Sequence, residues 1–233
     1  MQLFYESNFT KESSIISISA EESRHISKVL RKNIGDQVYI TNGSGLLAKG
    51  IMRSNHPKKC EIEVSEIQEK QKPRTHLHIA IAPTKANDRF EWFLEKATEI
   101  GIQEITPLLC EHSERKVIKK ERYEKVLLSA MKQSLSPFLP KLNPLTPFSD
   151  VINSEFNATK LIAHCENSPK EKLSKLCVEK NLILIGPEGD FSSTEIDKAL
   201  ANGFTATSLS ESRLRTETAG IVACHTVNLI QNL

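Results

Sequence analysis

The first seventy residues carry the hydrophobic pattern of short strands. Apolar and polar residues alternate in 36–41, which ends at a turn pair containing Gly43. Two further short apolar segments follow at 46–52 and 61–67. Several short strands separated by turn signals predict a small barrel or sandwich. The charged, proline-containing run 69–74 then marks a domain boundary.

Beyond this boundary the pattern changes to strands that alternate with helices. Short apolar runs predict strands at 77–82, 105–109, 161–163, 182–185 and 205–209. Apolar stripes at helical spacing predict helices at 88–100, at 123–131, from a capping box at Ser192–Glu195 to Gly203, and at 221–230. Continuous apolar strands are typical of buried parallel sheets. The sequence therefore predicts a β-rich domain over 1–72 and an α/β domain with a mainly parallel sheet over 73–233.

The composition of the chain narrows the classes of protein to which it can belong, but it does not indicate one function. The chain is 39% hydrophobic and 26% charged, with a net charge of +2. It lacks an apolar run that could span a bilayer and a recognisable secretion signal, so we expect a cytoplasmic protein without a membrane partner. Its five cysteines lie far apart, which favours reduced thiols over disulfides or a zinc site. The basic runs 24–32 and 114–122 are either phosphate-binding or solvated surfaces.

Two loops have the composition of a ligand site. The segment 185–191 places two glycines, a proline and a carboxylate directly after a buried strand, and 209–220 places Arg215 and Glu217 before the last helix. In open parallel sheets, ligands bind where loops leave the carboxyl ends of strands. An ordinary turn and a helix cap at Thr216 or Thr218 remain alternatives. Dinucleotide, P-loop, nucleophile-elbow and metal-ligand motifs are missing from the sequence.

These loops carry a family resemblance. Gly186-Pro187-Glu188-Gly189 and Leu214-Arg215-Thr216-Glu217 resemble the C-terminal signature of the 16S ribosomal RNA uracil-N3-methyltransferase family, within the SPOUT superfamily. The match continues through the middle motifs, such as 95–101, Ser113-Glu114-Arg115 and Gln133-Ser134, to His25 and 29–31 near the start. The likeness thus covers the whole chain.

The resemblance implies a SPOUT trefoil-knot methyltransferase domain after a PUA-like β-barrel that binds RNA. It also implies a homodimer that transfers methyl from S-adenosylmethionine to N3 of a U1498-type uridine in 16S ribosomal RNA, with the assembled small subunit as the expected partner. Uridine N3 must lose its proton to attack, so a base and a cation are needed. We expect Glu217 or Glu188 as the base and Arg215 as the anion stabiliser, although a structural role for each stays open.

The same resemblance assigns further residues. Expected cofactor contacts are His164, Ile185, Gly186, Pro187, Glu188, Gly189, Leu209, Ser210, Leu214, Arg215, Thr216 and Ala219. Expected RNA contacts are Arg24, Lys28, Arg31, Lys32, Lys85, Arg89, Arg115, Lys116 and Lys119. No metal site is expected.

The chain departs from the family pattern at three places. Ser210-Glu211-Ser212 replaces the usual Gly-Pro-Arg, Leu135-Ser136 replaces Gly-Arg, and Asp190 replaces a glycine. Two alternatives therefore remain: a non-catalytic RNA-binding module, and an enzyme that acts on another RNA or another base atom.

Overall fold

The chain forms two compact units. The structure is a computed structural model that describes residues 2–231. The first unit runs up to Lys72 and also contains Leu128–Leu139, while the second contains Pro73–Leu127 and the chain from Pro140 onward. Residues 128–139, which the sequence places within 73–233, therefore pack with the N-terminal unit.

The first unit is built on a five-stranded sheet in the order β1-β3-β4-β5-β2. Its elements are β1 (Leu3–Tyr5), β2 (Ile15–Ser17), α1 (Ala20–Arg24), the π-helix η1 (His25–Val29), β3 (Gln37–Thr41), β4 (Leu46–His56) and β5 (Lys59–Glu69). The pair β1–β3 is parallel, and the other pairs are antiparallel. Apolar side chains from the strands and from Ile26 of η1 form one buried cluster. The β-rich fold expected of this region is confirmed.

Residues 128–139 attach to the first unit through its backbone. The Gly45 amide donates to the Pro137 carbonyl at 3.0 Å, and the Leu139 amide donates to the Gly43 carbonyl at 2.9 Å. Both glycines have positive φ, at 107° and 72°, so the turn after β3 uses a conformation that favours glycine. The turn that contains Gly43 therefore also binds residues 128–139 through its backbone.

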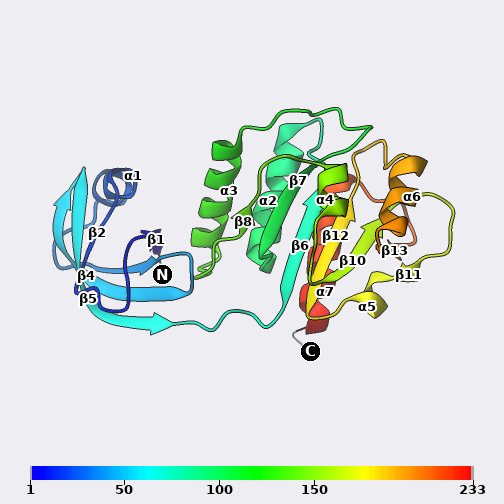
Figure 1. Cartoon of the computed structure of the whole chain (residues 1–233). Helices are drawn as coiled ribbons and strands as arrows, with labels where there is room; N and C mark the ends of the chain where they lie inside the picture. The colour runs from blue at the N-terminus through cyan, green and yellow to red at the C-terminus, as the bar shows by residue number, and fades with distance from the viewer. Residues whose placement is uncertain (1, 232–233) are drawn as a thin grey trace. The chain divides into compact units, whose positions relative to one another are not determined.

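The second unit is an α/β domain with an eight-stranded sheet. Along its main path the order is β11-β13-β10-β12-β6-β7-β8, with β9 also pairing with β7, and each pair is parallel. The strands are β6 (His76–Ile81), β7 (Glu104–Leu109), β8 (Lys141–Leu142), β9 (Thr146–Pro147), β10 (Thr159–Ala163), β11 (Glu171–Lys172), β12 (Lys180–Ile185) and β13 (Thr205–Ser208). The helices are α2 (Asn87–Ile100), α4 (Phe148–Asn153), α5 (Leu173–Leu176), α6 (Ser193–Ala201) and α7 (Thr216–Gln231). A further helix, α3 (Lys120–Gln133), belongs to this unit up to Leu127 and to the first unit from Leu128. Figure 1 shows these elements along the chain.

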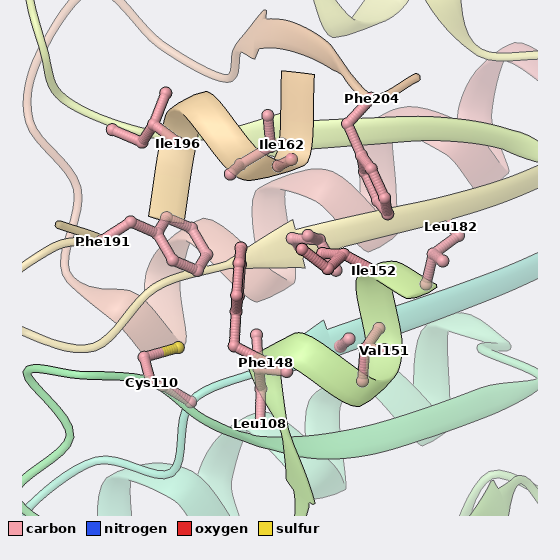
Figure 2. Close-up of a cluster of buried hydrophobic side chains, with 14 residues drawn as sticks. Leu108, Cys110, Phe148, Val151, Ile152, Ile162, Leu182, Phe191, Ile196 and Phe204 are labelled. Atoms are coloured by element: carbon pink, nitrogen blue, oxygen red, sulfur yellow. The ribbon is translucent and has the colours of Figure 1, made fainter. Parts of the chain in front are cut away.

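Helices cover both faces of this sheet. On one face, Val151 of α4 and Ile196 of α6 join strand residues such as Leu182 in a buried cluster, which Figure 2 shows. On the other face, α7 packs against α2 and β6. Because alternate residues of a strand point to opposite faces, burial on both sides explains the continuous apolar strands.

Local signals set the helix ends as the sequence predicts. Gly101 ends α2 with φ of 107°, and Ser192 with Glu195 forms a complete capping box at the start of α6. Within residues 2–231, no helix is long and apolar enough to span a bilayer. The five cysteines are free thiols, as expected, with Cys60, Cys110 and Cys224 buried.

The packing of α7 on α2 depends on a glycine. In Gly220→Ala, the new methyl carbon would lie 2.5 Å from Phe93 Cε2 and 3.0 Å from Ile81 Cδ1. Phe93 is fully buried, so either its ring or the two helices must shift. Overpacking costs about 1–3 kcal/mol, which outweighs the gain of at most ~1 kcal/mol from alanine's helix propensity. We expect a lower urea midpoint in equilibrium unfolding, whereas an unchanged or higher midpoint would contradict this close approach.

Candidate active site at the strand ends

A hollow opens where β10, β12 and β13 end. Its first part has a volume of about 380 Å³ and its second about 270 Å³. Both parts share Ala163, Cys165, Arg213, Leu214 and Ala219, so they form one strand-end cavity. The first part is also lined by His164, Lys170, Thr207, Ser208, Leu209, Ser210, Glu211 and Ser212. The second is also lined by Ile185, Gly186, Pro187, Glu188, Asp190, Arg215 and Thr216.

One hydrogen bond joins the two loops on which the sequence analysis focused. The buried Thr216 hydroxyl donates to the Gly186 carbonyl at 3.1 Å. Thr216 is the first residue of α7, so this contact fixes the helix start against the end of β12. The hydroxyl therefore bridges the loops, and the alternative of Thr216 as a simple helix cap is not what the structure shows.

Asp190 joins a third strand end to this site. Its Oδ2 accepts the Cys165 amide at 2.7 Å, and its Oδ1 accepts the Phe191 amide at 2.9 Å. Its backbone has φ of 64°, a left-handed conformation that aspartate tolerates better than most residues. One carboxylate thus connects Cys165, the second residue beyond β10, to the loop after β12.

His164 presents an unsatisfied polar group to the cavity. The residue is 8% exposed, and neither ring nitrogen has a hydrogen-bond partner among the described residues. Burial lowers the pKa of the imidazole from its ordinary value, and the nearby positive charge of Lys170 acts in the same direction. A neutral ring here offers one donor and one acceptor to a ligand.

The three candidate catalytic residues have different surroundings. Glu188 Oε1 accepts the Lys85 amide at 3.0 Å, which matches a turn-anchoring role. Glu217 is buried, with Oε1 at 3.9 Å from Arg89 Nε and Oε2 without a hydrogen-bond partner among the described residues. Arg215 is exposed and lines both the strand-end cavity and an adjoining hollow of about 710 Å³, which Glu217 also lines. Glu217 is therefore the better placed of the two carboxylates to exchange a proton.

Most of the expected cofactor contacts converge on the cavity. Gly189 is the exception, because it lines neither part, and a side chain there would lie against His112. Asp190, Glu211, Ser212 and Arg213 also line the cavity and lie in the two loops predicted as a ligand site, and Ala163 lies at the strand end expected beside His164. The lining residues that the sequence did not indicate are Cys165, Lys170, Thr207 and Ser208. Several follow strand ends in loops without a motif, so only the order of the strands brings them to the site.

The expected RNA contacts are divided between the units. In the first unit Arg24, Lys28 and Arg31 are exposed, while Lys32 is partly buried. In the second unit Lys85, Arg89, Lys116 and Lys119 are exposed.

Some of these cations already have protein partners. Lys85 pairs with Glu114 at 2.8 Å. Arg115 does not extend a free basic track, because its guanidinium donates to the carbonyls of Thr84 and Lys85. Arg115 therefore holds the loop after β6 in place.

Comparison with known proteins places this geometry in a family. A model of the RNA methyltransferase domain matches residues 70–228, and one of the RNA methyltransferase PUA domain matches residues 18–65. The ribosomal RNA small subunit methyltransferase E of Buchnera aphidicola is 33% identical over 88% of this chain and 84% of its own. The Bacillus subtilis protein of the same name is 27% identical over 94% and 91%.

The chain belongs to the ribosomal RNA small subunit methyltransferase E family.

Solved structures agree with this assignment. A “probable rRNA-methyltransferase” from Porphyromonas gingivalis has a TM-score of 0.91 at 41% identity and covers 100% of this chain and 99% of its own. A Legionella pneumophila structure with the cofactor SAM bound has a TM-score of 0.86 at 25% identity and covers 97% and 96%. The family indicated by the resemblance and the predicted fold class are confirmed.

Asp190 and Leu135, two positions at which the sequence departs from the expected family pattern, share a backbone feature. Both have positive φ, at 64° and 58°. This conformation favours glycine, which is the residue that the resemblance leads us to expect at both positions. At Asp190 the carboxylate contacts described above offset the strain.

Substitution of Asp190 separates these two contributions. Asp190→Ala loses the bonds to the Cys165 and Phe191 amides and keeps the backbone strain, so we expect it to lower the free energy of unfolding by about 1–3 kcal/mol. Asp190→Gly loses the same bonds but relieves the strain, so its loss should be smaller by roughly 1 kcal/mol. Urea titration of both variants measures this difference. Equal unfolding free energies for the alanine and glycine variants would show that the backbone there is unstrained.

Proposed function

We propose that this chain transfers a methyl group from S-adenosylmethionine to N3 of a U1498-type uridine in 16S ribosomal RNA. The observation that carries the proposal is the strand-end cavity, in which the loops after β10, β12 and β13 meet. Its position agrees with the rule that open parallel sheets bind ligands at carboxyl strand ends. Membership of the methyltransferase E family supplies the reaction and the RNA substrate.

The residues of the cavity fit S-adenosylmethionine. The unpartnered ring nitrogens of His164 can pair with polar groups of the cofactor, and Lys170 can pair with its carboxylate. Gly186 lines the cavity through its backbone, because a side chain there would lie against Phe191, 3.1 Å away. When bound, the cofactor supplies a methyl group on a positively charged sulfur.

The adjoining hollow contains the groups that the uracil requires. Uridine N3 is weakly acidic, and it attacks well only after losing its proton. Glu217 Oε2 is free to accept that proton, while Arg89 lies at the other carboxylate oxygen. Arg215, shared by both hollows, can stabilise the negative charge that develops on the uracil.

The RNA substrate and the path of the chain set further requirements. N3 lies on the Watson–Crick edge, so the target uridine must be unpaired. Residues 1–72, with 128–139, would form the RNA-binding PUA-like domain, and Arg24, Lys28 and Arg31 would contact phosphates.

In the second unit, the chain around α7 would form the trefoil knot. A cytoplasmic location remains a prediction.

The catalytic assignment is tested by Arg215→Ala. Removing one electrostatic contact to a developing anion lowers kcat by about 100–1,000-fold in comparable sites. We expect such a loss in methyl transfer to small subunits, measured as tritium incorporation at saturating cofactor, with an unchanged thermal melt. Arg122→Ala is the control, because Arg122 is an exposed arginine of α3 that pairs with Glu91 away from the cavity. Near-normal turnover of Arg215→Ala would remove this residue from the mechanism.

The substrate is tested by mapping modified nucleotides in 16S ribosomal RNA from a strain that lacks this gene. The U1498-type uridine should lose its N3-methyl group there and regain it on complementation. Methylation that persists in the deletion strain would assign the enzyme to another RNA or atom. Calorimetry that shows no binding of S-adenosylmethionine by the purified protein would instead favour a non-catalytic RNA-binding module.

The outward face of α7 supports a homodimer. Its inner face is buried at Gly220, Ala223, Cys224 and Val227. A second stripe at helical spacing is also mostly apolar yet exposed or half-buried, and it contains Thr218, Ile221, Val222, His225 and Leu229. An exposed apolar stripe on a helix is stabilised when another surface covers it. A second copy of this chain would complete that burial.

The dimer is tested at Leu229. A charge at an apolar interface lacks both water and a partner, so Leu229→Asp should shift the protein toward monomer at micromolar concentration. Size-exclusion chromatography with light scattering measures the mass. Leu200→Asp is a matched control, because Leu200 of α6 is 43% exposed and Leu229 is 50% exposed. A dimer that survives Leu229→Asp, or that Leu200→Asp disrupts equally, would place the interface elsewhere.

A further inference from the structure

A second groove lies wholly within the first unit, and the proposed reaction does not use it. Its volume is about 760 Å³. It is lined by Gln2, Leu3, His25, Lys32, Gln37, Tyr39, Ser129, Lys132, Gln133 and Leu135, here named the first-unit groove. The lining comes from β1, η1, β3 and the end of α3, and from Gln2, Lys32 and Leu135 beside these elements. Residues 128–139 therefore complete a site on the N-terminal sheet.

The lining is rich in hydrogen-bonding groups and contains no carboxylate. Gln2, Gln37 and Gln133 each carry an amide that both donates and accepts. Of these, Gln37 already donates to the Tyr39 hydroxyl. Carboxamides of this kind match the mixed donor and acceptor edges of nucleobases.

The cations of the groove are held in different ways. Lys132 forms an ion pair with the buried carboxylate of Glu22, which fixes its ammonium while leaving further N–H donors available. Lys32 donates to the Gln37 carbonyl at 3.4 Å and pairs with no carboxylate within residues 2–231. Lys28 and Arg31, on the same segment, are exposed and likewise lack an ion pair within those residues. The local charge therefore favours an anionic ligand.

Leu135 adds a strained apolar surface to the same groove. It has φ of 58°, which is unfavourable for a branched side chain, and it is 37% exposed. Burial of its side chain within the protein therefore does not offset the strain. A flat apolar ligand over Leu135 and the Tyr39 ring would use this surface.

We propose that the first-unit groove binds one unpaired nucleotide of the substrate RNA, with its base among the carboxamides and its phosphate near Lys32. A nucleotide combines a flat base, polar edges and a negative charge, and the lining offers a counterpart to each. The inference rests on the proposed function for the identity of the RNA. It goes further in assigning a base-binding site, distinct from the methylated uridine, to the N-terminal unit.

Fluorescence anisotropy of the full-length protein tests the groove with a labelled twelve-nucleotide single-stranded RNA that contains all four bases. Gln133→Ala removes a base-contacting amide without changing charge, and Lys32→Ala removes the phosphate partner. We expect each to raise Kd at least 5-fold. The Gln133→Ala effect should persist at higher salt, because it is not electrostatic.

Two exposed residues of the same unit provide matched controls. Gln68→Ala of β5 and Lys58→Ala of the turn after β4 should change Kd less than 2-fold. Equal weakening by Lys32→Ala and Lys58→Ala, with no effect of Gln133→Ala, would mean diffuse charge attraction and overturn the groove. Absence of RNA binding by the unmodified protein at low salt would overturn it too.

Further measurements distinguish this inference from the proposed function. Binding of S-adenosylmethionine, measured by calorimetry, should be the same in Gln133→Ala as in the unmodified protein. The unmodified protein could methylate small subunits while the groove variants bind the RNA as tightly as it does. That result would reject the nucleotide site in the first-unit groove and leave the proposed function intact. If the groove variants lose affinity for small subunits but not for the RNA, a ribosomal protein occupies the groove and the nucleotide assignment fails. Groove-dependent RNA binding without cofactor binding would instead reject the methyltransferase function.

Discussion

The hydrogen bond from the Thr216 hydroxyl to the Gly186 carbonyl is the contact on which the active site depends. It joins two loops that are thirty positions apart in the sequence, and it is buried. It fixes the start of α7, so it sets where Arg215 and Glu217 lie relative to the end of β12. The pairing of β10 with both β12 and β13 brings the two loops to one edge of the sheet, and this contact joins them there.

Two other features support this arrangement from either side. Gly220 lets α7 approach Phe93 of α2, which holds the helix that carries Glu217. Asp190 connects the loop after β12 to the Cys165 amide beyond β10. A glycine and the Asp190 carboxylate thus help to shape the site, while Arg213 and Arg215 of the cavity lining are exposed. This division suits a site in which positioning of two reactants contributes much of the rate.

Local signals were sufficient to predict most of the fold. The stripe on α2, the capping box of α6 and the continuous apolar strands each depend on neighbouring residues, and each occurs as predicted. Residues 128–139 were harder to place, because their attachment depends on backbone bonds to Gly43 and Gly45, which have no signature in the segment itself. The short strands β8, β9 and β11 were missed because two residues carry no periodicity.

The candidate site was predicted in outline, and the reasons for its gaps are physical. Motifs in the loops after β12 and β13 indicated Gly186 and Thr216, whereas Cys165 and Lys170 enter the site only through the order of the strands. Arg115 looked like a free cation in a basic run, but its guanidinium is bound to two carbonyls. The departures Asp190 and Leu135 became interpretable once their positive φ was known. The sequence identifies the residue at such a position, whereas the backbone φ angle shows whether the position favours glycine.

The central claim is that the loops after β10, β12 and β13 form one pocket for S-adenosylmethionine. Hydrogen–deuterium exchange of the full-length protein, with and without the cofactor, tests it most directly. The account predicts that amides in 163–165, 186–190 and 207–219 exchange more slowly with the cofactor present, while strands of the first unit are unchanged. Unchanged exchange in these three segments, or protection confined to the first unit, would contradict it.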